Sequence, residues 1–206
     1  GRGNYLMNRE KLKTKNENFI GCWNIDDKEL FSNIIDFFEE NKQLHQKGAV
    51  TSGLNYNKKK TTDLTIYPKY LKNKKFFIFN KFFEYLHTCY EDYKSQWPYL
   101  SKTYKKIEIP SFNIQKYNPG DHFSHIHCER ESPVVMHRLF AWMTYLNDLE
   151  TDNGKTNFVH YDIKVQPKRG KTLIWPAEWT HAHSGEILKQ EIKYIITGWM
   201  CLPIKT

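Results

Sequence analysis

The sequence predicts a mainly β protein with flanking helices and a double-stranded β-helix core, the jelly-roll arrangement also seen in cupins. With 206 residues, 39% hydrophobic and 16% aromatic, the chain is long enough to bury one core and too short for two. Two helical stretches fill the first half, whereas from Ile107 onward short apolar or alternating runs are separated by Pro, Gly, Asn and Asp. Helices followed by many short strands favour a closed or double-layered antiparallel fold that is supported on one side.

The chain divides into a tail and one folded domain. Residues 1–18 are polar and charged and offer little to bury, which predicts a flexible N-terminal tail. Residues 19–206 should form a single domain, with a helical buttress at about 26–95 and the jelly-roll core at about 107–202.

The folded domain begins with a strand and a helix. Residues 19–25 have the apolar character of a strand, and Asp26-x-x-Glu29 is a capping box that should start a helix. Apolar residues recur at helical spacing and form one stripe, made of Leu30, Phe31, Ile34, Ile35, Phe37 and Phe38. Such a stripe must pack on another element.

A polar segment and a second helix follow. Residues 43–63 contain two glycines and the run Lys58-Lys59-Lys60 but no apolar stripe, so we expect a long loop and a candidate lid. A helix should span about 71–93, with one apolar side formed by Phe76, Phe79, Phe83, Leu86 and Tyr90. The predicted strands of the core cover residues 112–118, 123–128, 138–147, 157–167, 171–175 and 191–200.

Several functional classes are disfavoured by composition. No stretch approaches the roughly 20 apolar residues of a membrane span, and the N-terminus lacks a secretory pattern. The cysteines Cys22, Cys89, Cys128 and Cys201 form no C-x-x-C pair, which disfavours a zinc ribbon or a disulfide framework. We therefore expect a soluble, cytoplasmic protein with reduced thiols.

The formal net charge of +8 is compatible with a nucleic-acid partner. The lysines are scattered through Asn-, Ile-, Tyr- and Phe-rich segments, however, and do not cluster in an obvious basic face. Charge alone therefore favours a generally basic protein over a nucleic-acid binder.

The densest group of chemically reactive residues surrounds His127-Cys128-Glu129. Residues two apart on a strand point the same way, so His127 and Glu129 should share a face. With one further His they would form two imidazoles and a carboxylate, which occupy one face of an octahedron around non-haem Fe(II). His181 and His183, which follow a predicted strand, are both available as the third ligand.

Other ligand sets compete with this triad. His125 with His127 is an H-x-H pair on one face, and His181 with His183 is another, so the four could hold zinc or a cupin-type metal. An H-x-E spacing is weak evidence by itself, because most histidines bind no metal.

Further motifs recur in a fixed order from Phe112 to Leu202, about half of the chain. They are Tyr117-x-x-Gly120-x-x-Phe123, Arg138, Tyr145-Leu146-Asn147, Gly154-x-Thr156-x-Phe158, Val165-x-Pro167-Lys168-x-Gly170, and Lys193-Tyr194-x-x-Thr197-Gly198-Trp199. In combination with the histidines, the segment resembles the prolyl 4-hydroxylase branch of the iron(II)- and 2-oxoglutarate-dependent oxygenases.

The resemblance implies the metal ligands His127, Glu129 and His183. In the family a basic residue follows the distal His by about ten positions, and Lys193 follows His183 at that distance, which leaves His181 as the substitute. The family uses H-x-D where this chain has H-x-E. The longer carboxylate keeps the charge and the oxygen ligand but must fold back or shift the metal.

The resemblance also implies a cosubstrate site. Strand alternation places Lys193 and Thr197 on one face, and a buried ammonium beside a hydroxyl suits the far carboxylate of 2-oxoglutarate. Tyr117 and Tyr145 match family positions that hydrogen-bond this cosubstrate. Arg138 matches a family arginine near the substrate, but it lies seven residues before Tyr145 and would face the opposite way on an unbroken strand.

The function implied is that of an Fe(II)- and 2-oxoglutarate-dependent dioxygenase, which takes O₂, converts 2-oxoglutarate into succinate and CO₂, and hydroxylates a C–H bond. A prolyl residue in a peptide is the first candidate substrate, followed by a small amino-acid-like molecule. A nucleic-acid demethylase of the same superfamily is encouraged by the charge, but no aromatic platform is visible. The rival from another class is a non-catalytic, metal-binding recognition module.

Overall fold

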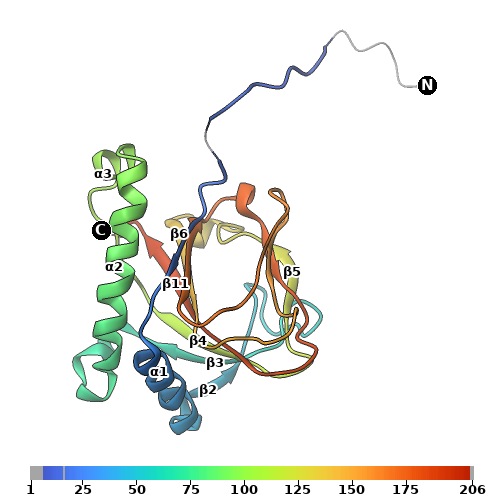
Figure 1. The fold of residues 1–206 in the computed structure, drawn as a ribbon. Coiled ribbons are helices and arrows are strands. Elements are labelled where there is room, and N and C mark those ends of the chain that lie inside the picture. Colours follow the sequence, from blue (N-terminus) through green and yellow to red (C-terminus); the bar gives the residue numbers. More distant parts are fainter. Residues whose placement is uncertain (1–6, 16, 205–206) are drawn as a thin grey trace.

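Two antiparallel sheets form the core of the molecule (Figure 1). The computed structural model describes residues 7–15 and 17–204. The larger sheet has the order β1-β9-β6-β11-β4-β3-β2 and the smaller one β5-β10-β7-β8, which confirms the jelly-roll prediction. The strands are β1 Gly21–Asn24, β2 His45–Lys47, β3 Thr62–Ile66, β4 Phe112–Tyr117, β5 Phe123–His127, β6 Arg138–Tyr145, β7 Thr156–Phe158, β8 Ile163–Val165, β9 Lys171–Pro176, β10 His183–Gly185 and β11 Lys193–Cys201.

Helices cover one side of the larger sheet, and β5 lies on the opposite side of the molecule (Figure 1). The α-helices are α1 Lys28–Glu40, α2 Ile78–Gln96 and α3 Tyr99–Thr103. Short 3-10 turns lie at Lys42–Leu44, Pro68–Lys72, Lys74–Phe76, Pro133–Val135 and Trp179–His181. Residues 7–15 and 17–18 carry neither helix nor strand.

The predicted stripe of α1 is confirmed, but its cap is not Asp26. Asp27 occupies the N-cap, where its Oδ1 accepts a hydrogen bond from the Leu30 backbone N–H at 3.1 Å. The helix therefore starts one residue later than the capping-box spacing predicts. All members of the stripe except Ile35 are fully buried.

Strand alternation sorts the side chains of β6 into two cores. Phe140 and Trp142 face the helices and join the cluster that includes the α1 stripe. Ala141, Met143 and Tyr145 face the other sheet and join a second cluster between the sheets. One strand thus packs on both faces, as a central strand in a three-layered structure must.

A β-bulge at the start of β6 decides where Arg138 points. In the pairing of β6 with β11, Met200 is opposite Phe140 but Cys201 is opposite Arg138, so Leu139 is the extra residue. Leu139 packs against the helix-side core, and Arg138 stacks on Trp199 at the other face. The bulge thus explains how Arg138 and Tyr145 can face the same side of the sheet although seven residues separate them.

The prediction of an uninterrupted loop over residues 43–63 is wrong. β2 and the beginning of β3 lie within it and extend the larger sheet. The buried Asp63 interrupts the apolar pattern by which β3 would be recognised, because a charged residue stands where an apolar one is expected. Its carboxylate accepts hydrogen bonds from Thr61 Oγ1 at 2.6 Å and from Gln115 Nε2 at 3.3 Å, which compensate for its burial.

Three other boundaries differ from prediction. The expected strand over 157–167 is the hairpin β7–β8, whose turn has Asp162 in the left-handed region at φ 53°. β10 is only three residues long and was not predicted. The second helix starts at Ile78 because two 3-10 turns, the first of which begins at Pro68, occupy the residues before it.

Within the described residues, no helix has the length and apolar character to cross a membrane. All four cysteines are free thiols, and Cys89 and Cys201 are buried.

Candidate active site

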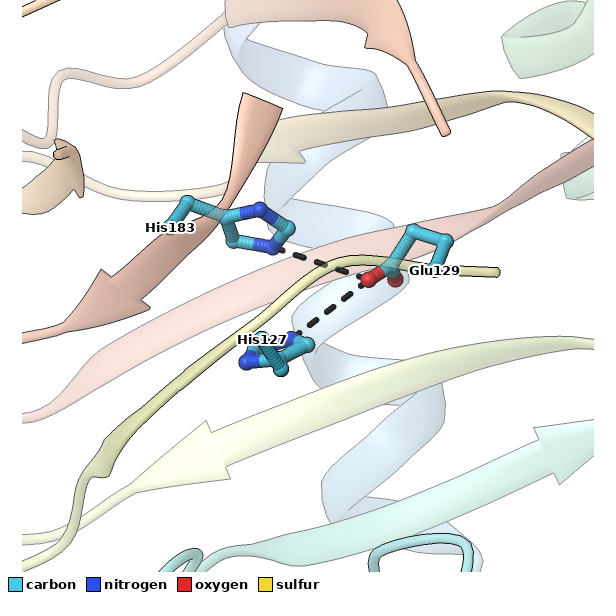
Figure 2. Close-up of side chains that lie close together, drawn as sticks. All are labelled: His127, Glu129 and His183. Atoms are coloured by element: carbon cyan, nitrogen blue, oxygen red, sulfur yellow. Dashed lines mark ion pairs between the residues drawn. The ribbon is translucent and has the colours of Figure 1, made fainter. Parts of the chain in front are cut away.

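Three side chains, two from the smaller sheet and one from the segment after β5, converge on one point (Figure 2). His127 ends β5 and His183 begins β10, and the two residues are directly paired across the strands. Glu129 follows β5 by two residues. Its Oε2 lies 3.4 Å from His127 Nε2 and 3.7 Å from His183 Nε2. All three ligand atoms lie within 4.8 Å of one another.

The hydrogen bonds of the two rings define which nitrogen is free. His127 Nδ1 contacts the His125 carbonyl at 2.8 Å, and His183 Nδ1 contacts the His181 carbonyl at 3.0 Å. A carbonyl only accepts, so each Nδ1 carries a proton, and in the neutral ring the lone pair is on Nε2. Burial, followed by the nearby His183, lowers the pKa of His127 to about 4, which keeps its ring neutral at pH 7.

This arrangement fits a bound cation. Two unprotonated nitrogens and a carboxylate oxygen face one another with no hydrogen between them, which is unfavourable unless a positive charge lies at the centre. Ligands about 2.1 Å from a metal and at right angles lie about 3 Å apart, close to the 3.4 and 3.7 Å observed. Hydrogen bonds from ligand rings to backbone carbonyls are typical of metal sites.

The competing histidines do not join the cluster. His125 is half-buried and lies outside the cluster, with its ring centre 6.2 Å from that of His127. His181 is engaged at both ring nitrogens, by Thr180 Oγ1 at 2.8 Å and by the Asn18 carbonyl at 2.6 Å. Among the described residues, His127, Glu129 and His183 form the one group of three or more His, Cys, Asp or Glu side chains with metal-site spacing. The H-x-H alternatives therefore receive no support.

The cluster opens into a cavity of about 710 Å³ between the two sheets. The smaller sheet contributes the cluster, and the larger sheet contributes polar and aromatic side chains from β4, β6 and β11. A mixed lining with a few convergent polar groups is typical of a small-molecule site. The residues that line the cavity include Tyr117, Arg138, Thr156, Trp175, Lys193, Thr197 and Trp199.

Lys193 is a buried cation without a carboxylate partner in the described residues. It begins β11, opposite Tyr117 on β4, and only 3% of its surface is exposed. Its Nζ donates to the Gly154 carbonyl at 2.9 Å and lies 4.3 Å from the centre of the Tyr117 ring. Burial lowers the pKa of Lys193 to about 8. A buried ammonium that lacks a counterion is well suited to receive an anion.

Of the three other predicted cosubstrate residues, two line the cavity and one does not. Tyr117 and Thr197 line the cavity, and their hydroxyls donate to Gln115 Oε1 at 3.1 Å and to the Trp142 carbonyl at 2.8 Å. Tyr145 lies behind the lining, where its hydroxyl is 2.5 Å from that of Thr156.

The segment predicted as a lid lines the outer part of the cavity, from Gln46 to Lys59. Its end is fastened to β5 by backbone hydrogen bonds, with Lys60 and His122 exchanging two and His125 donating to the Lys58 carbonyl. Lys59 is buried beside Asp63 at 3.6 Å, and its ammonium lies 4.8 Å from the Phe123 ring centre. The sequence provided no reason to single out Lys59.

Two tryptophans at the site were also not assigned roles from the sequence. Trp199 Nε1 donates to Glu129 Oε1 at 3.1 Å, and Arg138 stacks on the Trp199 ring at 3.8 Å. Trp175 packs against His183, with ring centres 5.1 Å apart, and its indole N–H has no partner among the described residues. For Trp199, strand alternation was a usable sequence signal, because it places this residue on the same face as Lys193 and Thr197.

Comparison with known proteins agrees with this geometry. A family model described as the 2OG-Fe(II) oxygenase superfamily matches residues 112–201, from β4 to the end of β11. A search by sequence finds no match among curated proteins.

Solved structures of prolyl hydroxylases share the fold. A viral collagen prolyl hydroxylase from Paramecium bursaria Chlorella virus-1, in complex with 2-oxoglutarate, is 16% identical, with a TM-score of 0.65 over 89% of this chain and 96% of that one. A Pseudomonas putida prolyl-4-hydroxylase is 12% identical, with a TM-score of 0.67 over 90% and 94%. A Trichoplax adhaerens prolyl hydroxylase, in complex with a hypoxia inducible factor peptide fragment, is 14% identical, with a TM-score of 0.66 over 90% and 84%.

The matched segment contains most of the two-sheet core and the three converging side chains of His127, Glu129 and His183. The cavity that this segment lines together with residues of 46–65 also holds the buried lysine. Residues 112–201 therefore match the 2OG-Fe(II) oxygenase superfamily, whose members use Fe(II), 2-oxoglutarate and O₂, and the chain has the fold of the prolyl hydroxylases.

Proposed function

We propose that this protein is an Fe(II)- and 2-oxoglutarate-dependent dioxygenase that hydroxylates a C–H bond in a peptide, with a prolyl residue as the first candidate. Residues 19–206 would act as one catalytic domain. The observation that carries the proposal is the convergence of two unprotonated imidazole nitrogens and one carboxylate oxygen in a cavity that also contains a buried, unpaired ammonium.

His127, Glu129 and His183 would hold Fe(II). Burial raises the pKa of Glu129, but the neighbouring histidines, the Trp199 indole and Arg138 outweigh that effect, so the pKa lies below its usual value. The carboxyl group is thus an anion at neutral pH. Two neutral imidazoles and one anion leave open positions on a six-coordinate metal for cosubstrate and O₂.

Lys193 would receive the distal carboxylate of 2-oxoglutarate. Its ammonium still has two protons free after the bond to Gly154, and Thr197 and Tyr117 lie in the same lining. A carboxylate arriving here would supply the missing counterion in a water-poor environment, where the charge-assisted bond is strong.

The residues of the protein would position the reactants, while the cofactor supplies the oxidation. When bound, Fe(II) with 2-oxoglutarate and O₂ provides the chemistry that inserts one oxygen atom into a C–H bond and places the other in succinate, with release of CO₂. Segment 46–59, which lines the cavity, would act as the lid that excludes water. Arg138, at the same lining, is a candidate for contact with the substrate.

A peptide substrate is favoured by two observations. Structures with this fold include a prolyl hydroxylase in complex with a peptide fragment. Exposed apolar side chains also lie near the cavity, because Val135 lines it and the adjacent Val134 and Met136 are 76% and 46% exposed. A small amino-acid-like substrate and a nucleic acid are the next candidates. The free thiols support a reducing compartment, and we propose the cytoplasm.

A peptide screen tests the proposed substrate class. Proline-containing peptides, free amino acids and single-stranded oligonucleotides are each incubated with the Fe(II)-loaded protein, 2-oxoglutarate and O₂. We expect a proline peptide to increase succinate release and to gain the mass of one oxygen atom. The control is the same peptide with alanine in place of proline. Succinate release coupled equally to both peptides would contradict prolyl hydroxylation, and coupling only to oligonucleotides would support the demethylase.

A further inference from the structure

The two carboxylate oxygens of Glu129 have different partners. Oε2 faces the nitrogens of His127 and His183 at 3.4 and 3.7 Å. Oε1 points the other way and accepts a hydrogen bond from Trp199 Nε1 at 3.1 Å. An indole N–H donates to the anion and cannot accept, so this contact fixes which oxygen remains for a metal.

Trp199 is itself held in place by contacts from β6. The Arg138 guanidinium lies 3.8 Å from the centre of the Trp199 ring, and Arg138 Nη1 donates to the Glu129 carbonyl at 3.0 Å. On the far side, Trp142 Nε1 donates to the Trp199 carbonyl at 3.2 Å. Arg138 thus links the backbone of the ligand residue to the ring that anchors its side chain. It reaches this position because of the bulge at Leu139.

We propose that Trp199 and Arg138 are positioning residues that adapt the site to a glutamate ligand. This inference rests on the proposed metal site. A glutamate has one more rotatable bond than an aspartate, so its carboxylate samples more orientations and can reach a metal with both oxygens. The indole hydrogen bond removes that freedom and reserves Oε1, which leaves Oε2 as the single oxygen offered to the metal.

The geometry predicts that Glu129 and Trp199 depend on each other. An aspartate at this position would withdraw the carboxylate by one methylene, about 1.5 Å. With the backbone in place, the shorter side chain could then not hold one oxygen at the indole and the other opposite the histidines. The hydrogen bond to Trp199 should therefore matter for a glutamate ligand and contribute little to an aspartate ligand.

Metal titration of four proteins tests this dependence. The wild type, Trp199→Phe, Glu129→Asp and the double variant are titrated by calorimetry with Mn(II), a redox-stable probe, without 2-oxoglutarate. We expect Trp199→Phe to weaken Mn(II) binding by about 10–100-fold in the wild-type background, the usual effect of losing a partner of a ligand. In the Glu129→Asp background the same change should have little effect.

The matched control is Trp23→Phe. Trp23 Nε1 donates to Asp92 Oδ2 at 2.9 Å, which is the same kind of bond between β1 and α2. Its loss should leave Mn(II) affinity unchanged. If Trp199→Phe does not fold, as judged by near-UV circular dichroism, Arg138→Lys is the second variant. It keeps the charge but loses the planar stack, and we expect weaker Mn(II) binding in the glutamate background only.

Three outcomes would overturn the inference. Unchanged Mn(II) affinity in Trp199→Phe would show that the indole does not position the ligand. An equal loss in the glutamate and aspartate backgrounds would show a general structural role instead. Both results leave the proposed metal site intact, because the wild type still binds. Failure of the wild type to bind Mn(II) would remove the proposed metal site and this inference together.

Discussion

Replacement of Lys193 by methionine should remove the cost of a buried charge from the empty protein and at the same time weaken 2-oxoglutarate binding. Burial lowers the pKa of Lys193 from 10.5 to about 8. At about 1.4 kcal/mol per pKa unit, the folded protein carries a cost of about 3 kcal/mol for keeping this charge in its interior. Methionine has a similar length and no charge, so the variant avoids the cost.

The stability difference should depend on pH in a defined direction. Below pH 8 the lysine is charged in both the folded and the unfolded protein, and the full cost is present. As pH rises from 8 toward 10.5, the folded protein releases the proton first and the cost fades. Methionine also leaves the Gly154 carbonyl without its partner, which costs about 1–3 kcal/mol at any pH. The change between pH values is therefore the more informative quantity.

Urea denaturation of the wild type and Lys193→Met at pH 7.5 and 9.5 measures this quantity. We expect the difference in unfolding free energy between the variant and the wild type to shift by about 2 kcal/mol in favour of the wild type from pH 7.5 to pH 9.5. Calorimetry with Mn(II)-loaded protein should show about 100-fold weaker binding of 2-oxoglutarate to the variant, because a charge-assisted contact is lost. A pH-independent difference would refute the buried charge, and equal 2-oxoglutarate affinity would refute the cosubstrate role.

Three further predictions concern the metal, the proton and the fold. His127→Ala and His183→Ala should each abolish binding of one Fe(II), whereas His125→Ala and His181→Ala should retain it; the reverse pattern would favour the H-x-H sites. Binding of 2-oxoglutarate to the wild type above pH 8 should take up a proton, so the calorimetric heat should depend on the ionisation enthalpy of the buffer. The affinity should fall by up to about tenfold per pH unit. A buffer-independent heat would contradict this prediction. Gly170→Ala should lower the free energy of unfolding by about 2–5 kcal/mol, because φ is +85° and a Cβ would lie 2.0 Å from the Ile25 carbonyl oxygen. The control Gly53→Ala, at φ +111° with open space around it, should cost only the backbone strain. Similar losses at both glycines would contradict the packing argument.

Sequence patterns predicted the features of the fold that depend on a regular period. The apolar stripe of α1 and the alternation along β6 and β11 repeat over several residues, and each repeat adds to the signal. β3 was missed because Asp63 is buried by hydrogen bonds that only the folded chain supplies. β10 was missed because three residues are too few to display a period.

The candidate site was predictable to the extent that it follows from local spacing and a family motif. His127 and Glu129 are two residues apart, and His183 stands ten residues before Lys193. The choice of Oε2 over Oε1 at Glu129 depends on Trp199, 70 positions away in the sequence. The side of the sheet toward which Arg138 points depends on a bulge of one residue. Neither long-range pairing nor a single inserted residue leaves a pattern in the sequence.

Succinate formation is the most direct test of the central claim that this chain is an oxygenase. Protein loaded with Fe(II) and 2-oxoglutarate without O₂ is exposed to O₂, and succinate is measured against a metal-free sample and His183→Ala. We expect slow release from the wild type alone, faster release with the right substrate, and none from either control. Absence of succinate from wild-type protein that demonstrably holds both Fe(II) and 2-oxoglutarate would contradict the oxygenase and favour a metal-binding recognition module.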